Sequence, residues 1–139
     1  MVLSLDNKLL SLLNYLMLAV FILAIVVQYN DPDSIIWMVV YGLAAIVCYL
    51  ASMNQLHWML PATISVSVLT WGIILVMKIE GRISFYDLFL SSWTMKSQTV
   101  ELMREVGGLT IILFWMITLS LSNNPLFINF LNIKKLNKY

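Results

Sequence analysis

A long stretch without charge constrains the fold of this chain more than any other feature. No Asp, Glu, Lys or Arg occurs between Asp33 and Lys78, and a break rich in polar residues lies at 53–58. A helix of about 20 mostly apolar residues crosses the hydrocarbon core of a membrane. The stretch therefore predicts two membrane-spanning helices, at 34–52 and 59–77, joined by a turn at the polar break.

The composition of the whole chain indicates the same class of protein. Charged residues make up 11% of the 139 residues and hydrophobic residues 61%, whereas a soluble domain has about 25% charged and roughly 45–50% apolar residues. Most of the surface must therefore face lipid. A net charge of +1 argues against nucleic acid as a partner. The single cysteine, Cys48, excludes an intrachain disulfide and a cluster of thiols around a metal.

Two further apolar stretches predict spans at 9–28 and 106–122. The first exceeds the roughly 7–15 apolar residues of a signal peptide, so we expect it to be retained. These runs lack the alternation of a barrel strand, and only helices otherwise satisfy their backbone groups in lipid. The sequence thus predicts an all-α membrane protein, a four-transmembrane-helix bundle that forms a single domain over residues 1–139.

Two segments outside the spans carry mixed signals. Within 79–105, the aromatic residues Phe85, Phe89 and Trp93 recur at helical spacing, which favours a short interfacial amphipathic helix over a folded loop at the same depth. The tail at 123–139 opens with Asn-Asn-Pro, which should end the last span, and it closes with lysines. Such a tail is typical of a membrane-surface anchor, and a docking segment for a partner is the alternative.

Four spans place both termini on one side of the membrane, together with the turn at 53–58. The two sides carry equal numbers of Lys and Arg, so the positive-inside rule does not decide the orientation. The loop of the first hairpin has neither residue and would translocate easily. We therefore expect a multi-pass integral membrane protein with cytoplasmic termini.

The densest polar cluster lies between the first two spans. The topology places it on the same side as the charged residues before the fourth span, and opposite His57. Glu101 and Glu105 are four residues apart, hence on one helix face. The candidate site residues at this mouth of the bundle are Gln28, Asn30, Asp31, Pro32, Asp33, Glu101, Arg104 and Glu105.

This cluster has a purely structural interpretation. Asp31 suits the N-cap of the second span, and Pro32 suits the first helical position. Asp33 would place negative charge at the positive end of the helix. Arg104 can pair with a carboxylate of the loop. On this interpretation the cluster caps and ties helices without binding any ligand.

A divalent cation is the alternative, because hard cations prefer carboxylate and amide oxygens. The candidate ligands are Asn30, Asp31, Asp33 and Glu105. No His or Cys lies nearby, so the cluster does not support zinc, haem or an iron–sulfur centre, and no organic cofactor is indicated. The same carboxylates are capable of general acid–base chemistry, but their spacing indicates no reaction class.

Other residues of the spans predict packing. Trp37 and Tyr41, four apart, either line a pocket below the acidic loop or pack within the bundle and the aromatic belt. Small residues allow close contact between helices in membranes. They recur on the second and fourth spans at Ala44, Cys48, Ser52, Gly107 and Gly108.

Two patches carry a resemblance to a known family. The run Val27–Asp33, followed by Trp37 and Tyr41, resembles the first hairpin of the transmembrane protein 220 family. The pattern Arg104-Glu105-x-x-Gly108-Leu109 is similar to the second patch of that family. The resemblance implies a four-helix multi-pass membrane protein and no established activity. The family's marked residues correspond to Gln28, Asn30, Asp31, Pro32, Asp33, Trp37, Tyr41 and Glu105.

Two functions fit this sequence. The first is a non-catalytic accessory or scaffolding subunit of a larger membrane assembly, whose partners are the lipid bilayer and other membrane subunits. The alternative is a small cation- or headgroup-binding membrane protein, or an enzyme, that uses Asp31, Asp33 and Glu105. A channel is disfavoured because transport needs ionisable groups at mid-membrane.

Overall fold

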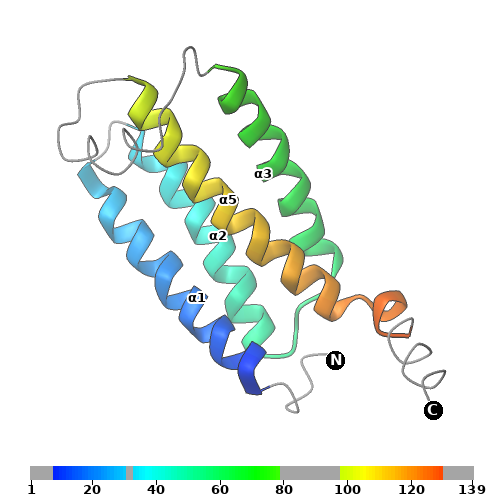
Figure 1. Cartoon of the computed structure of the whole chain (residues 1–139). Helices are drawn as coiled ribbons and strands as arrows, with labels where there is room; N and C mark the ends of the chain where they lie inside the picture. The colour runs from blue at the N-terminus through cyan, green and yellow to red at the C-terminus, as the bar shows by residue number, and fades with distance from the viewer. Residues whose placement is uncertain (1–7, 31–32, 79–97, 130–139) are drawn as a thin grey trace.

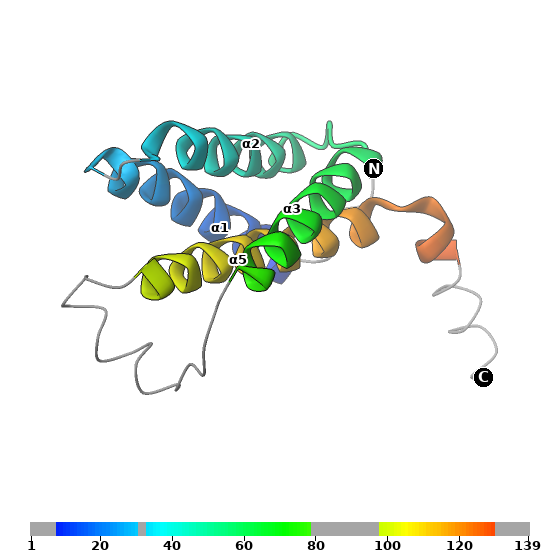
Figure 2. The same cartoon turned by 90° about the horizontal axis from the view of Figure 1, so that it is seen from above.

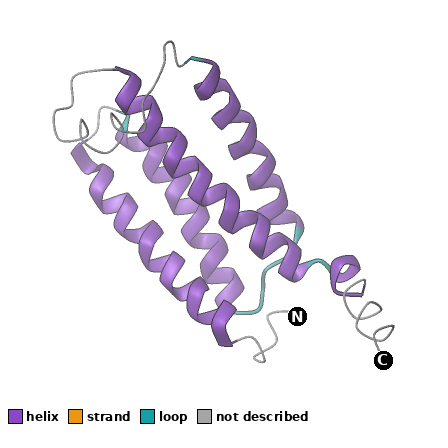
Figure 3. Cartoon of the chain, viewed as in Figure 1, coloured by secondary structure: helices purple, strands orange, loops and turns teal. Residues whose placement is uncertain are grey.

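The computed structural model describes residues 8–30, 33–78 and 98–129, and its regular structure is helical (Figures 1 and 3). No strand occurs among the described residues. A further helix begins at 125 after a break at Asn124. The elements before it are α1 (Lys8–Val27), the 3-10 helix η1 (Gln28–Asn30), α2 (Ser34–Ser52), α3 (Met59–Met77) and α5 (Gln98–Asn123).

The prediction of an all-α bundle with four spans is confirmed. All four long helices are long and apolar enough to cross a membrane, and the bounds of α2 and α3 coincide with the predicted 34–52 and 59–77. The protein is therefore an integral membrane protein. The interfacial helix expected within 79–105 and the lysines of the tail lie outside the described residues.

The start of the fourth span was predicted wrongly. α5 begins at Gln98 instead of 106, so it includes the last part of the segment predicted as interfacial. The stretch that qualifies as membrane-spanning begins at Leu102. Charged residues mark where a helix leaves the hydrocarbon core, but good helix formers such as Glu and Arg do not end the helix itself.

The helices form two antiparallel pairs. α1 packs on α2 and α3 packs on α5, and the pairs meet chiefly where α2 lies against α5. Figure 1 shows the four long helices side by side, and Figure 2 shows the two pairs from above. The start of α1 and the end of α5 lie at the same end of the bundle as the turn at 53–58. The predicted sidedness of these segments is therefore correct.

The core lies where α2 faces α5. Ala44 and Cys48 of α2 are fully buried, and so are Ile112, Met116 and Leu119 of α5. Small side chains on one helix let large ones from the other pack closely. By contrast, α1 buries only Asn14 and Phe21. Leu10, Met17 and Leu18 pack partly buried against the core, and most of its other apolar side chains face outward, as expected for a helix bathed in lipid.

The turn between the two pairs has a defined cap. Asn54 adopts a left-handed backbone with φ 56°. The Gln55 N–H donates to the Leu50 carbonyl (3.0 Å), and the Asn54 N–H donates to the Ala51 carbonyl (3.1 Å). These bonds form a Schellman motif, which satisfies the last carbonyls of α2. The Ser120 hydroxyl of α5 then donates to the Trp58 carbonyl (3.1 Å), which ties the turn to the fourth span.

The fourth span ends as the Asn-Asn-Pro sequence predicts. Asn124 Oδ1 accepts hydrogen bonds from the N–H groups of Leu126 (2.9 Å) and Phe127 (3.4 Å). Asn124 is thus the N-cap of a new helix, with Pro125 at its first position. The choice between a surface anchor and a docking segment depends on residues outside the described part, so it stays open.

Candidate functional site

The predicted mouth of the bundle exists as one end of the structure. The end of α1, the start of α2 and the start of α5 lie together at that end, which carries Gln28, Asp33, Arg104 and Glu105 (Figure 1). Asp31 and Pro32 lie outside the described residues, and the side chains of Asn30 and Glu101 are likewise not described. The meeting of the two patches at one end is therefore confirmed at the level of the helices.

The predicted capping roles need correction. α2 begins at Ser34 with Asp33 as its N-cap, so Asp31 is not the N-cap and Pro32 is not the first helical position. The Asp33 carbonyl accepts from the N–H groups of Ile36 (3.1 Å) and Trp37 (3.4 Å). The Asp33 carboxylate makes no capping hydrogen bond. With φ −101° and ψ 26°, its backbone lies outside the extended region from which a cap side chain reaches the helix N–H groups.

An aromatic cluster lies directly below this mouth. The Trp37 ring stacks on Trp71 of α3 with 5.2 Å between ring centroids, and its centroid lies 6.1 Å from that of Tyr41. Tyr41 in turn stacks on Phe21 of α1 at 6.4 Å. Trp37 is only 4% exposed. The packing interpretation of Trp37 and Tyr41 is therefore correct, and the cluster joins three helices. Sequence spacing gave no signal for Trp71 or Phe21, because neither lies on the same helix.

Tyr41 also connects the two family patches. A Cβ atom on Gly108 would collide with the Tyr41 hydroxyl, so only glycine permits this approach of α5 to α2. One turn earlier on the same face of α5, Arg104 lies close enough to act electrostatically on that hydroxyl. The predicted close contact at Gly108 is confirmed. At Gly107 it is wrong, because an added Cβ would meet nothing within 4 Å.

The cation site stays a prediction. Within the part of the chain that is described, no group of three or more His, Cys, Asp or Glu side chains could hold a metal ion, but Asp31 lies outside that part. Arg104 and Glu105 both have interaction partners. His57 lies at the opposite end, exposed, with its Nδ1 accepting from the Met59 N–H (3.4 Å), so it does not contribute to this mouth.

The sequence reasoning missed a buried polar contact between α1 and α2. Asn14 is 1% exposed. Its Nδ2 donates to the Cys48 carbonyl (2.8 Å) and to the Ser52 hydroxyl (2.9 Å). The Ser52 hydroxyl itself donates to the Cys48 carbonyl (3.0 Å). A single amide in an otherwise apolar span was the signal that could have revealed it.

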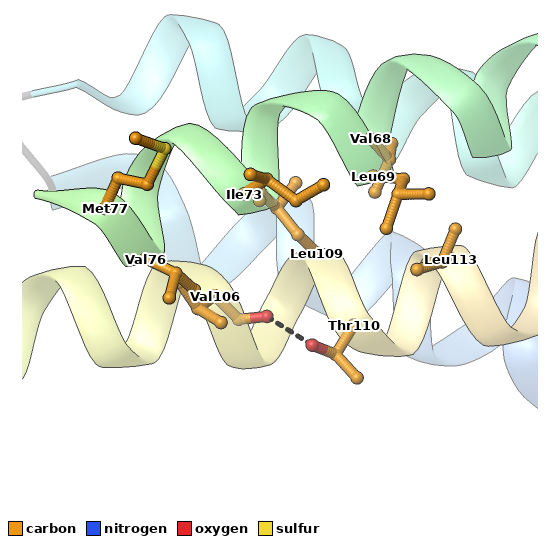
Figure 4. A pocket seen from close by; sticks show the side chains of 10 residues that line it. Val68, Leu69, Ile73, Val76, Met77, Val106, Leu109, Thr110 and Leu113 are labelled. Atoms are coloured by element: carbon orange, nitrogen blue, oxygen red, sulfur yellow. Dashed lines mark hydrogen bonds between the residues drawn. The ribbon is translucent and has the colours of Figure 1, made fainter. Parts of the chain in front are cut away.

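A groove between α3 and α5 was also not predicted. It has a volume of about 280 Å³ and is lined by aliphatic side chains of both helices and by Gly72. Figure 4 shows the lining side chains in close view. The Thr110 hydroxyl is the polar group of the lining, and it donates to the Val106 carbonyl of its own helix (2.7 Å). The Thr110 oxygen can still accept a hydrogen bond, but one acceptor is too little to fix the orientation of a polar ligand.

Comparison with known proteins places these features in one family. No solved structure matches the chain. A family model described as transmembrane family 220, helix, matches residues 20–121. The match spans most of the chain and contains the Gln28–Asp33 loop, Tyr41, Arg104 and Gly108. The resemblance carried by the two sequence patches is thereby confirmed, and the chain belongs to transmembrane family 220.

Proposed function

We propose that this protein is a non-catalytic accessory or scaffolding subunit of a larger membrane assembly. The observation that carries the proposal is the groove between α3 and α5. It opens within the membrane-spanning part of both helices, and its lining is apolar except for the Thr110 hydroxyl, which is bonded to its own helix. A site for a small ligand needs a few precisely placed polar groups to fix its orientation. The groove has no set of such groups, so it suits the apolar side chains of a partner's transmembrane helix.

The bundle interior supports a role without chemistry. No Asp, Glu, Lys, Arg or His is among the buried side chains that the structure describes. Its described buried polar residues are Asn14 and Ser65, and the Ser65 hydroxyl donates to the Pro61 carbonyl of its own helix (2.8 Å). General acid–base catalysis and ion transport both depend on positioned ionisable groups. The described interior offers packing surfaces instead.

Filling the groove tests the proposal directly. A Cβ on Gly72 meets Leu109 at an ordinary 4.0 Å, so Gly72→Leu should fold and project its side chain into the groove. A photocrosslinking residue at Ile73 should give a protein adduct in native membranes, and Gly72→Leu should abolish it. Gly107→Leu is the matched control, because Gly107 is exposed and away from the groove. That variant should keep the adduct.

Three results of this experiment decide the proposal. A protein adduct that Gly72→Leu removes and Gly107→Leu preserves supports it. An adduct between two copies of this chain would instead identify a homodimer. Crosslinks to lipid alone, from a protein that is a monomer on native gels of mildly solubilised membranes, would refute the subunit role.

A second candidate is the binding of a cation or a polar headgroup at the mouth. It is favoured by the Asp33 carboxylate, which makes no capping hydrogen bond although it stands at the N-cap. Added Ca²⁺, Mg²⁺ or Mn²⁺ should then raise the melting temperature of the purified protein. Asp31→Asn and Glu105→Gln should each remove that rise, whereas Asp6→Asn, in the sequence before α1, should not. A melting temperature that no cation moves excludes the cation form of this candidate.

We further propose that both termini are cytoplasmic. The first loop carries neither Lys nor Arg, so it opposes its own translocation little. A fluorescent protein that folds only in the cytoplasm, fused after Tyr139, should be fluorescent. A membrane-impermeant reagent added outside the cell should label the Asp33→Cys variant. No labelling, together with a fusion that is not fluorescent, would show the opposite orientation.

A further inference from the structure

Two polar atoms inside the bundle have no hydrogen-bond partner among the described residues. They are Oδ1 of Asn14 on α1 and Nε1 of Trp115 on α5. Both residues are more than nine-tenths buried, at 1% and 5% exposed. Buried polar atoms are almost always paired with the protein or with ordered water. The two atoms therefore call for a common explanation.

The orientation of the Asn14 amide is fixed by its surroundings. The Cys48 carbonyl can only accept, so the amide atom that faces it at 2.8 Å must be the nitrogen. The Ser52 hydroxyl uses its proton on the same carbonyl, so it too must accept from the nitrogen. Both amide protons are thus used, and an exchange of the two amide atoms would break both bonds. Oδ1 remains as the acceptor without a donor.

The unpaired donor lies in the same neighbourhood. Asn14 bonds the Cys48 carbonyl, and the indole of Trp115 lies near the Cys48 thiol, a weak acceptor whose approach to the indole N–H falls short of hydrogen-bond geometry. Asn14 and Trp115 do not bond each other. One atom only accepts and the other only donates. A molecule between them must donate to Asn14 Oδ1 and accept from the Trp115 N–H, which a single water does.

The position along the helices makes this site internal. With a rise of about 1.5 Å per residue, Asn14 lies about 9 Å from the start of α1, and Trp115 lies about 12 Å from the end of α5. The start of α1 and the end of α5 lie at the same end of the bundle. They therefore lie at similar depth within the hydrocarbon region, where lipid supplies no hydrogen bonds.

We propose that the bundle holds a bound water molecule at this depth, bridging Asn14 Oδ1 and Trp115 Nε1 beside Cys48. The water joins α1 to α5 across α2, so the site is complete only when the two helix pairs are assembled. Asn14, Cys48 and Ser52 form its fixed frame, and the Trp115 indole forms its opposite wall. This binding site is independent of the groove between α3 and α5.

Magnetisation transfer from water tests the proposal in the full chain. The protein is labelled with ¹⁵N at its tryptophan indoles and placed in lipid nanodiscs, and Trp115→Phe assigns the Trp115 signal. The wild-type Trp115 N–H should receive magnetisation from water at short mixing times. Trp58, at the bundle end, serves as the positive control. If Trp58 receives magnetisation from water and Trp115 does not, the proposal is overturned. A direct hydrogen bond from Trp115 to Asn14 would give this result.

Two variants separate a bound water from other sources of the signal. Ser52→Ala removes the nearby exchangeable hydroxyl and should leave the transfer in place. Asn14→Leu removes one anchor and should abolish it at Trp115 while Trp58 is unchanged. Transfer that survives Asn14→Leu overturns the bridge. If that variant does not fold, the wild-type and Ser52→Ala measurements still decide, because a signal lost in Ser52→Ala came from the hydroxyl.

Discussion

The two helix pairs differ in where their polar side chains make hydrogen bonds. In the first pair, Asn14 of α1 reaches across to the Cys48 carbonyl and the Ser52 hydroxyl of α2. In the second pair, the hydroxyls turn back on their own helices, as Ser67 does to Thr63 on α3 and Thr110 to Val106 on α5. The first pair is therefore specified by a polar contact. The second pair has the Ser120 bond to the Trp58 carbonyl at its turn, but along its length it packs chiefly by shape, and it leaves an open groove.

This difference indicates that the two helix pairs have different roles in the fold. A hydrogen bond across two helices fixes which faces meet, at a contribution of only about 0.6 kcal/mol on average in membranes. A pair without such a bond along the length of its helices keeps its surface adaptable and free for another apolar partner. The contact of Tyr41 with Gly108 joins the two pairs, so we expect its loss to lower the stability more than the loss of a contact within either pair.

The largest loss is expected where the pairs join. Gly108→Leu places a side chain where the Tyr41 hydroxyl lies, and overpacking of this kind costs about 1–3 kcal/mol or more. We expect a clear fall in the unfolding free energy measured by denaturant titration in detergent. Gly107→Leu should be nearly neutral, because nothing lies within 4 Å of its Cβ. Equal losses in both variants would mean that the two pairs do not meet at Tyr41.

A smaller loss should distinguish the pairs themselves. Asn14→Leu removes the bonds that cross from α1 to α2, and we expect a loss of about 0.6–1.7 kcal/mol, the measured range for such contacts. Ser67→Ala in α3 removes only an exposed bond within one helix, so its effect should stay within about 0.5 kcal/mol. The same denaturant titration compares them, and a larger loss for Ser67→Ala would invert the comparison.

The turn that links the pairs should respond at about 1 kcal/mol. Asn54→Ala forces a residue with a Cβ and no stabilising amide into a left-handed backbone, which costs about 1 kcal/mol relative to asparagine. Asn54→Gly should be neutral or slightly stabilising, because glycine adopts φ 56° without strain. The check is the melting temperature of the two variants side by side. An alanine variant as stable as the glycine variant would contradict the Schellman cap.

The smallest effect is expected inside the groove. Gly72→Ala adds a Cβ at van der Waals distance from Leu109 and replaces the poorer helix former, a preference worth about 1 kcal/mol in exposed helices. We expect a slight rise in the melting temperature, with partner binding retained. A fall would indicate that α3 and α5 pack more tightly at this point than the groove implies.

The sequence predicted the helices better than their arrangement. Charge-free runs located α2 and α3 because lipid tolerates little charge and a bilayer sets the length of a span. The same rule misplaced the start of α5, where Glu101, Arg104 and Glu105 continue the helix beyond the apolar run. A hydropathy pattern reports depth in the membrane, whereas the end of a helix depends on its caps.

The candidate site was predicted in part for a similar reason. Topology alone placed Asp33 and Arg104 at one end, and the resemblance identified Tyr41 and Gly108 as notable positions. That these two residues touch could not be predicted, since contact depends on how each helix is rotated about its axis. The same limit hid the pairing of Asn14 with Ser52 and the groove on α3. The N-cap role was assigned to Asp31 from residue preference, whereas α2 begins at Ser34 with Asp33 as its N-cap.

The sparse burial of α1 has a consequence for biosynthesis. α1 is made first, and its outward face suits lipid along nearly its whole length, so it enters the bilayer without help from later segments. Asn14 is the exception, and its partners exist only after Ser52 has been synthesised. Once Ser52 has left the ribosome, the first hairpin can close, before any residue of α5 has emerged. The order of synthesis therefore matches the order in which the helices obtain their packing and hydrogen-bond partners within the protein.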